Sequence, residues 1–380
     1  MTADTEPTRL VVLSLERWDE VWRRNQYLLD GLLRRDPTLE VLFVEPPADP
    51  MHALARGARP HRGLGLRTAH GYDGRLHLYE PTKLLPRLFG PAADGLLRAE
   101  LRSAVRRLRW RSGMLWINDP AAARLVGRPG WPALYDITDD WVEAARGARE
   151  HDRIERSDTY LLAFCEEVVV CSPVLLRAKS ALRPAGASAP RLIPNAVDRA
   201  RYRMPHARPD DLPVAPVALY VGTLHEDRLD VDLVVATADA VGAAGGVVVL
   251  VGPNALSEPN ARRLHEHPAV LVLGARDRDA VPGYLQHADV LIVPHRVDDF
   301  TESLDPIKLY EYLAVGRPVV STPVAGFRDD QRVELADPRT FATVVAARAA
   351  THVPTVEHDG VPDWSDRVAD VEDVLAALRR

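Results

Sequence analysis

The chain has 380 residues, 46% of them hydrophobic and 27% charged, and a formal net charge of −6. This composition is typical of a packed globular protein, and this length predicts two domains rather than one. No apolar run reaches the roughly 18 residues that a membrane-spanning helix needs, and residues 1–7 lack the apolar core of a secretion signal. The charge balance also argues against a nucleic-acid-binding domain, which would carry a strongly basic face.

Two residue types are scarce enough to be informative. The chain has two cysteines, Cys165 and Cys171, which are too few for a disulfide framework or a structural zinc site. We interpret them as small buried hydrophobic residues, which predicts a protein of the reducing cytoplasm. Only three of the 48 basic residues are lysines, Lys83, Lys179 and Lys308, so each lysine is a candidate functional residue.

Short apolar runs alternate with amphipathic helical patterns along the whole chain, which predicts βαβ units and parallel sheets. In the first half, strands are expected at residues 10–15, 41–44, 114–117, 133–137 and 168–171, and helices at residues 20–35 and 92–109. Residues 46–74 are rich in proline, glycine and arginine and show no clear period, so this stretch is expected to be irregular.

A second series of the same kind follows. Strands are expected at residues 217–221, 247–251, 270–273, 290–293 and 318–321, and helices at residues 229–241, 280–286, 306–315 and 364–378. The polar stretch 200–216, with four prolines, is interpreted as a linker or domain edge.

These patterns predict an N-terminal domain (1–198), a C-terminal domain (199–363) and a final helix (364–380) that packs back on the first domain. Ligands of such sheets bind at the carboxyl ends of the strands, here in an expected cleft between the domains.

The most informative segment is residues 288–323, in which a buried strand, a polar loop and a helix follow one another. Asp305 is expected to cap the helix and Pro306 to occupy its first position. Lys308 then lies in the first turn, one turn before Glu311. A helix N-terminus attracts a diphosphate, and a lysine adds a point charge there, while Glu311 can accept hydrogen bonds from ribose hydroxyls. The ordinary alternative is a surface ion pair between the two side chains.

The letters of this segment resemble the donor-binding motif of retaining GT-B glycosyltransferases of the large family four, especially its teichuronic-acid-biosynthesis-like branch. The matching residues are Pro306, Lys308, Glu311, Tyr312, Leu313, Ala314, Gly316, Pro318, Val319, Val320 and Thr322. The resemblance implies an α/β chain with the GT-B fold, two Rossmann-like domains facing each other across a cleft. It also implies sugar transfer from a nucleotide-diphosphate sugar, with UDP as a guess, with retention of configuration and without a metal or other cofactor.

The same resemblance implies a set of donor-binding residues. They are Gly222, Thr223, Arg228, Gly252, Arg276, His295, Ser303, Asp305, Ile307, Lys308 and Glu311. Gly222 lets the backbone approach a phosphate, Arg228 is a candidate for the diphosphate, and Arg276 is a candidate to stack on the base; solvated loop arginines are the alternatives for both. Many relatives have a glutamate where this chain has Ser303, so Glu302 or Asp305 would have to hold the donor sugar.

The first half carries candidate acceptor-binding residues. Relatives in this branch have a tryptophan followed by R-x-Q after the first strand, and here these letters fall on Trp18, Arg24 and Gln26. Asn118 ends another predicted strand. Trp18 can stack on a sugar or an aromatic acceptor, whereas most other tryptophans of this half are expected in the core.

Two carboxylates follow the strand predicted at residues 133–137. Relatives carry a similar Y-D-x-x-D-D string, which here places Asp139 and Asp140 at the strand's carboxyl end. We take both as catalytic candidates that act on the acceptor, beside Lys308 and Glu311 on the donor side. The alternative for Asp139 is that it caps the next helix.

Other functions are less well supported by the sequence. A nucleotide-sugar epimerase and a catalytically inactive nucleotide-sugar-binding protein share the expected fold and stay open as alternatives. An NAD-dependent oxidoreductase is disfavoured because no G-x-G-x-x-G follows a predicted strand. The basic stretch Arg98–Arg111 can rest on an anionic membrane as an amphipathic helix, or it is simply a solvated arginine-rich face.

Overall fold

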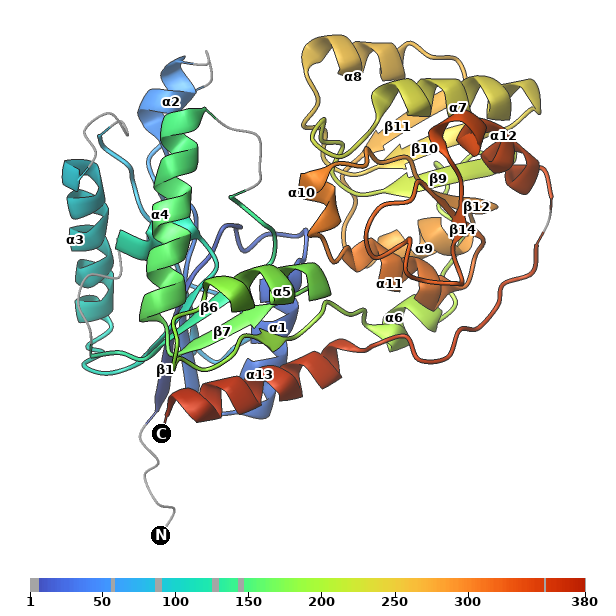
Figure 1. The fold of residues 1–380 in the computed structure, drawn as a ribbon. Helices are drawn as coiled ribbons and strands as arrows, with labels where there is room; N and C mark the ends of the chain where they lie inside the picture. Colours follow the sequence, from blue (N-terminus) through green and yellow to red (C-terminus); the bar gives the residue numbers. More distant parts are fainter. Residues whose placement is uncertain are drawn as a thin grey trace. The chain divides into compact units, whose positions relative to one another are not determined.

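A computed structural model describes residues 7–55, 59–85, 91–124, 130–142, 147–351 and 353–379. The chain divides into two compact units (Figure 1). Unit 1 contains Met1–Pro194 with Arg367–Arg380, and unit 2 contains Asn195–Asp366. The expectation about a secretion signal concerns residues 1–7, of which all except Pro7 lie outside the described residues.

Unit 1 is built on an eight-stranded sheet with the order β3-β4-β2-β1-β5-β6-β7-β8. Every neighbouring pair is parallel except β3 and β4. The strands are β1 (Thr8–Leu13), β2 (Leu39–Val44), β3 (Gly65–Thr68), β4 (Leu76–Glu80), β5 (Met114–Ile117), β6 (Ala133–Ile137), β7 (Glu167–Val170) and β8 (Arg191–Leu192). The helices are α1 (Arg24–Arg35), α2 (Pro50–Ala55), α3 (Pro91–Arg107), the short 3-10 helix η2 (Pro120–Arg124), α4 (Ala148–Phe164), α5 (Pro173–Leu182) and α13 (Trp364–Leu378).

Unit 2 is built on a fully parallel sheet with the order β11-β10-β9-β12-β13-β14. The strands are β9 (Val217–Val221), β10 (Val247–Val251), β11 (Val270–Gly274), β12 (Val290–Val293), β13 (Val319–Ser321) and β14 (Glu334–Leu335). The helices are α6 (Arg199–Arg203), α7 (Val231–Ala243), α8 (Glu258–His265), α9 (Val281–Gln286), α10 (Asp299–Glu302), α11 (Ile307–Val315) and α12 (Pro338–Ala349).

The strand β9 shows why these sheets read as continuous apolar runs. Val217, Leu219 and Val221 belong to one buried cluster, together with residues of α9 and α11. Ala218 and Tyr220 belong to a second cluster, with residues of α7 and α12. Both faces of the strand are therefore covered by helices, as expected for a parallel sheet.

Most predicted elements lie where the sequence places them, but three expectations about irregular or helical stretches are wrong in detail. Residues 46–74, expected to be irregular, include α2 and β3, because β3 pairs antiparallel with β4. Residues 200–216 are no linker: Tyr202 and Leu212 are buried in the core of unit 2. The helix expected from residue 20 begins at Arg24, because the side chain of Gln26 accepts the Arg23 N–H at 3.1 Å and fixes the start there.

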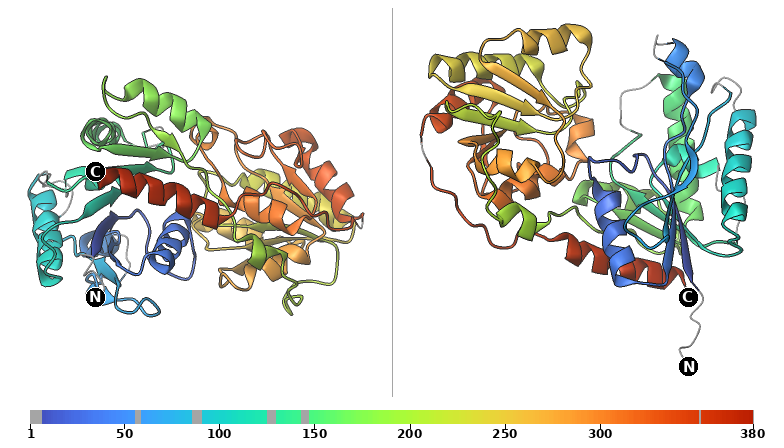
Figure 2. Two further views of the ribbon diagram at one scale, coloured as in Figure 1. Left: turned by 90° about the horizontal axis from the view of Figure 1, so that it is seen from below. Right: turned by 180° about the vertical axis from the view of Figure 1, so that it is seen from behind.

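The C-terminal helix α13 lies beside α1 in unit 1 (Figure 2). Gly31 of α1 allows this close packing, because a Cβ at that position would lie 2.4 Å from Cγ2 of Val368. Arg35 adds a hydrogen-bonded ion pair to Glu372 at 3.1 Å. The two helices are thus held by both apolar and charged contacts.

Helix α11 ends at Gly316, which adopts a left-handed conformation with φ +75°. A Cβ at this position would lie 2.0 Å from the carbonyl oxygen of Val356. The backbone of Val356 donates to the Gly316 carbonyl at 2.9 Å, so this close approach is part of the fold. Only glycine meets both requirements, the left-handed φ and the absent side chain.

We predict that Gly316→Ala destabilises unit 2 far more than Gly245→Ala does. Gly245 has a similar φ of +77°, but a Cβ there meets nothing within 4 Å. Gly245→Ala therefore costs only the left-handed conformation, about 1 kcal/mol, or about 2–4 °C in a unit of this size. Gly316→Ala adds a backbone clash and should cost about 3 kcal/mol or more. Thermal unfolding of both variants checks this, and equal losses would contradict it.

Candidate active site

The strands β9 and β10 of unit 2 lie side by side, and each is followed by a glycine with a positive φ. Gly222 follows β9 and Gly252 follows β10, and both have φ +148°. Gly222 donates to the Val251 carbonyl at 2.8 Å. A Cβ at Gly252 would lie 2.1 Å from the carbonyl oxygen of Gly222. Glycine is required here because the two turns pass so close together.

The ammonium group of Lys308 lies over the first of these turns. Its Nζ donates to the hydroxyl of Tyr220 at 2.8 Å, lies 3.4 Å from Nε2 of His295, and is 4.1 Å from the centre of the Tyr220 ring. A Cβ at Gly222 would lie 2.8 Å from this Nζ. The glycine therefore leaves the space that the ammonium occupies.

The charges around Lys308 are mostly of its own sign. Burial and the charge of Arg228 together lower the pKa of Lys308 to about 7, and Glu311 acts in the opposite direction. Burial, Lys308 and Arg228 together hold the pKa of His295 well below its usual range. No carboxylate of the described residues makes a salt bridge to Lys308. An anion bound here would relieve the repulsion between the two cations.

Glu311 does not pair with Lys308, although it lies one turn later on α11. Its Oε1 accepts a hydrogen bond from the hydroxyl of Tyr202 at 2.5 Å. Burial raises the pKa of the Glu311 carboxyl, while Tyr202 and Lys308 act in the other direction. Since Lys308 is bonded to Tyr220 and Glu311 to Tyr202, the alternative of an ordinary surface ion pair is wrong.

The N-terminus of α11 differs from the expected cap. The capping residue is Pro306, not Asp305, and Pro306 has no side chain that could accept a cap hydrogen bond. Asp305 instead accepts from the backbone N–H of Asn195 and from the Tyr310 hydroxyl, the latter at 2.6 Å. Asp305 does not occupy the cap position because its carboxylate binds Asn195 next to the start of the helix. The N-cap residue of α11 therefore satisfies none of the first backbone N–H groups with its side chain.

The structure gives the two acids next to Ser303 other partners. The carboxylate of Glu302 makes two hydrogen bonds to Arg328, at 2.9 and 2.8 Å, and Asp305 is bound as described. Ser303 itself is buried. Glu302 or Asp305 could hold a donor sugar only if its present hydrogen bonds were replaced by bonds to the sugar.

Two further donor candidates lie near the ends of β9 and β11. Thr223 is exposed in the turn after β9. Arg276, after β11, donates to Asp211 at 2.6 Å and to Tyr284 at 2.9 Å. The guanidinium N–H groups are therefore used inside unit 2, and stacking on a base stays a prediction.

Sequence analysis singled out neither Tyr220 nor Tyr202, although both bind candidate residues. Tyr220 is buried, and burial raises its pKa above the usual range. A phenol inside the otherwise aliphatic strand β9 was the available signal. Tyr202 had no such signal, because it lies in the stretch that was interpreted as a linker.

In unit 1, the acceptor candidates Arg24 and Asn118 meet on a buried carboxylate. Asp136 is fully buried in β6 and accepts from Arg24 at 3.2 and 3.3 Å. It also accepts from the Trp116 indole and from Asn118, each at 3.2 Å. Arg24 and Asn118 are themselves buried. Both side chains therefore bind a carboxylate inside unit 1, and neither faces an open surface.

The other members of the W…R-x-Q pattern also make contacts inside unit 1. The side chain of Gln26 donates to the Arg17 carbonyl at 2.9 Å and caps α1 as described. Trp18 is half-buried and packs edge-on against Phe43, with ring centres 5.2 Å apart, and Tyr72, at 6.0 Å. The pattern therefore shapes the loop between β1 and α1, and contact with an acceptor stays a prediction.

Asp139 and Asp140 follow β6, and a buried lysine holds the second of them. Lys179 bonds Asp140 and Asp158, each at 3.1 Å. The next helix, α4, has Gly147 as its N-cap. The alternative that Asp139 caps this helix is therefore wrong, and its half-exposed side chain stays at the carboxyl end of β6.

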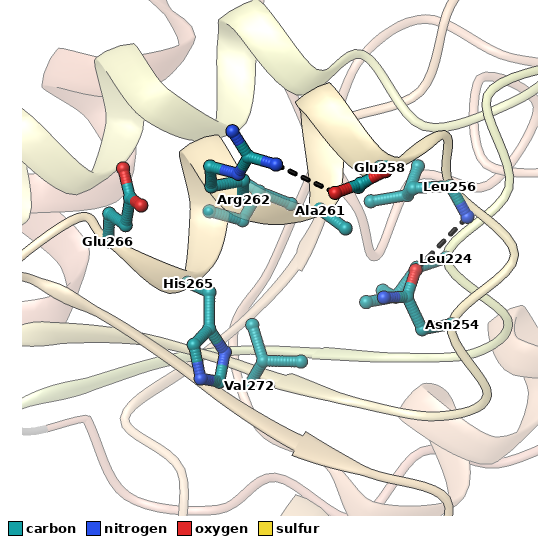
Figure 3. A pocket seen from close by; sticks show the side chains of 10 residues that line it. Leu224, Asn254, Leu256, Glu258, Ala261, Arg262, His265, Glu266 and Val272 are labelled. Atoms are coloured by element: carbon teal, nitrogen blue, oxygen red, sulfur yellow. Dashed lines mark hydrogen bonds and ion pairs between the residues drawn. The ribbon is translucent and has the colours of Figure 1, made fainter.

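Each unit contains a hollow of its own. In unit 1, a pocket of about 930 Å³ opens near the carboxyl ends of the sheet strands. Its lining includes Leu15, Met51, Lys83, Asp119, Trp141 and Arg153. In unit 2, a hollow of about 300 Å³ lies between α8 and β11 (Figure 3), where Arg262 donates to Glu258 at 2.7 Å. This second hollow contains none of the predicted donor residues.

Several further expectations concern the chain as a whole. Both cysteines are buried, as expected, and neither forms a disulfide within the described residues. Within the described ranges, no helix is both long and apolar enough to cross a bilayer, and no three His, Cys, Asp or Glu side chains are grouped to hold a metal ion. On α3, Leu97, Leu101 and Ala104 are buried and Val105 is partly buried, so most of the apolar face of the Arg98–Arg111 stretch packs inside unit 1.

Two doubly wound α/β units in one chain, each on a largely parallel sheet, define the fold class as GT-B. Residues 215–351 match the family described as Glycosyl transferases group 1. A protein named as a teichuronic acid biosynthesis glycosyltransferase, TuaH of Bacillus subtilis (strain 168), is 22% identical over 328 residues, which are 82% of this chain and 80% of TuaH. The chain is thus a glycosyltransferase with a group 1 domain in unit 2, and the predicted resemblance is confirmed.

Solved structures show the same fold over the whole chain. Sucrose-phosphate synthase from Thermosynechococcus elongatus superposes with a TM-score of 0.65 at 16% identity, covering 98% of this chain and 99% of that one. Anabaena HepE in complex with UDP and glucose also gives a TM-score of 0.65, at 14% identity, covering 97% and 100%. These likenesses confirm the predicted fold class.

We predict that Arg24→Ala strongly destabilises unit 1, because it leaves the Asp136 carboxylate buried without its cation. Such a loss costs roughly 3–5 kcal/mol. Arg34→Ala is the matched control: its guanidinium pairs with Asp30 at 2.9 Å, but its side chain is 69% exposed, so the change should cost under about 1 kcal/mol. Thermal unfolding measures both. The double variant Arg24→Ala/Asp136→Ala should recover part of the loss, and equal effects of the two single variants would refute the prediction.

Proposed function

We propose that the chain transfers a sugar from a nucleotide-diphosphate sugar, bound by unit 2, to an acceptor bound by unit 1. The observation that carries this proposal is the Lys308 ammonium over the Gly222 turn, in the first turn of α11, with Arg228 as a second cation nearby. Such a place combines free N–H groups, a helix dipole and two positive charges. A diphosphate has the charge and size to use all of them.

The donor would lie along the carboxyl ends of β9 and β10. Its diphosphate would face Lys308, Arg228 and the first N–H groups of α11, and a ribose hydroxyl would donate to Glu311, which already accepts one hydrogen bond from Tyr202. We propose UDP as the nucleotide, because the HepE structures similar to this chain are named as complexes with UDP. His295 would stay neutral beside the lysine, because its pKa is held low.

The reaction breaks the bond between the anomeric carbon and the diphosphate, and forms a bond from that carbon to an acceptor oxygen. The negative charge that grows on the leaving diphosphate would be stabilised by Lys308 and Arg228, a kind of effect that commonly contributes about 3 kcal/mol. We propose that no metal is needed, because these cations are already in place. We also propose that the configuration of the anomeric carbon is retained. Asp139 and Asp140 would orient the acceptor. The reaction would take place in the cytoplasm.

The first test is a thermal-shift panel of UDP-, GDP- and dTDP-sugars. One nucleotide should stabilise the wild-type chain by about 2.7 kcal/mol at 100 times its dissociation constant. Lys308→Ala and Glu311→Gln should lose at least about tenfold in affinity, which is 1.4 kcal/mol. Arg262→Ala, which removes an exposed cation of α8 that pairs with Glu258 and makes none of the proposed contacts, should bind like the wild type. Unchanged binding by Lys308→Ala would refute the donor site.

The second test uses pH. The lysine of the ligand-free protein has a pKa of about 7, and a bound diphosphate favours its protonated form. Above pH 7 binding must therefore take up a proton, and affinity should fall by up to about tenfold per pH unit between pH 7.5 and 9. The phosphate itself, with a second pKa of about 6, is already ionised in this range.

Calorimetric titration of UDP across this range measures the slope. Lys308→Arg is the control variant, because a guanidinium stays charged and should remove the pH dependence. A wild-type affinity that is flat from pH 7.5 to 9 would show that Lys308 does not neutralise the ligand.

A further inference from the structure

Four large aliphatic side chains of unit 1 are more than half exposed on neighbouring segments. They are Met51 at 51%, Leu54 at 61%, Leu64 at 68% and Leu84 at 55%. Single exposed aliphatic residues are ordinary, but a contiguous group of them marks an interaction surface. None of the site residues discussed above accounts for this group.

Hydrogen bonds donated by backbone N–H groups hold the three segments together. Lys83 donates its N–H to the Ala48 carbonyl at 2.8 Å, which joins residues 82–84 to the start of α2. Gly63 donates to the Thr82 hydroxyl at 3.0 Å, and Leu64 donates to the Glu80 carboxylate at 2.9 Å. The four side chains therefore come from one continuous part of unit 1, at α2 in Figure 1.

The charge of this region is positive. Residues 50–72 contain four arginines and three histidines but no aspartate or glutamate, and Arg59 and Arg62 are exposed. Three nearby acids are paired: Asp49 binds Lys83 at 2.6 Å, Glu45 binds Arg67 at 2.7 Å and Glu80 binds Arg17 at 2.6 Å. Asp73, which follows this stretch, is exposed. Exposed aliphatic residues next to arginines are typical of surfaces that rest on anionic membranes.

We propose that this surface, the α2 face (Met51, Leu54, Leu64, Leu84, Arg59 and Arg62), docks on an anionic lipid bilayer. The aliphatic side chains would enter the headgroup region, and the arginines would face lipid phosphates. This assigns membrane contact to a different place from Arg98–Arg111, whose apolar residues are buried or partly buried against the core of unit 1.

The position of the α2 face also suggests which acceptors the enzyme uses. Met51 lines the pocket of about 930 Å³ together with Lys83, Asp119 and Trp141. A bilayer that touches Met51 would present the head of a lipid-anchored acceptor at the mouth of this pocket. This extension to a lipid-linked substrate rests on the proposed transferase function, whereas the docking itself does not.

A second copy of the chain is the less favoured occupant. A two-fold symmetric contact would bring the same face of both copies together. Arg59 and Arg62 of one copy would then approach those of the other, and no acid of residues 50–72 could compensate them. An anionic lipid surface instead complements both the charge and the aliphatic side chains.

Vesicle flotation of the full chain tests the proposal. Vesicles of phosphatidylcholine with 30% phosphatidylglycerol should bind the protein about tenfold better than phosphatidylcholine alone, and 0.5 M salt should weaken this binding. The variants Met51→Ser/Leu54→Ser and Arg59→Gln/Arg62→Gln should each lose about tenfold in partitioning. Their thermal unfolding should be unchanged, because the substituted side chains are exposed.

Helix α5 of unit 1 offers a matched control. Leu182 is 61% exposed, as Leu54 is, and Arg177 is exposed on the same helix, so Leu182→Ser/Arg177→Gln should bind vesicles like the wild type. The proposal is overturned if the protein does not float with anionic vesicles at low salt, or if the α5 variant loses as much binding as the α2 variants. It is also overturned if ultracentrifugation finds a dimer that the α2 variants abolish while vesicle binding is absent. Since the assay contains neither nucleotide nor acceptor, its result is independent of the proposed transferase function.

Discussion

The structure of unit 2 depends on how a lysine ammonium is accommodated above a backbone turn. Lys308 is bonded to Tyr220 and lies close to His295, neither of which supplies a negative charge. Gly222 makes this possible because it has no Cβ to fill the space, and Gly316 ends the helix that carries the lysine. Together these residues keep a cation in place without a carboxylate partner, which prepares the turn for an anionic ligand.

Unit 1 uses charge in the opposite way. Its central acids are paired inside the fold: Asp136 with Arg24, and Asp140 and Asp158 with Lys179. Buried pairs of this kind are costly to break, so they fix the loops that follow β1 and β6. Unit 2 therefore keeps a positive charge that we propose for a ligand. In unit 1 the charged side chains instead hold the loops that border its pocket.

Sequence periodicity predicted ten strands to within about two residues, because parallel strands covered on both faces are continuous apolar runs. It did not predict β3, β4, β8 and β14. It failed where partners are distant in sequence. The pairing of β3 with β4 creates a strand in a stretch without a period, and the core contacts of Tyr202 turn an apparent linker into part of unit 2. The arginine-rich pattern on α3 is real, but its apolar face is buried, and the exposed aliphatic residues lie on short loops where no period exists.

The sequence by itself determined the α/β class, the family and the order of the donor motif, because these depend on local composition and on spacing along one helix. Only the tertiary structure decided what each side chain binds. In the structure, Lys308 binds Tyr220 and Glu311 binds Tyr202, so these two side chains do not pair with each other. Asp305 binds Asn195 instead of capping the helix. The physical reason is that a polar side chain is stabilised by whichever groups surround it after folding, and those groups come from strands and loops far away in the chain.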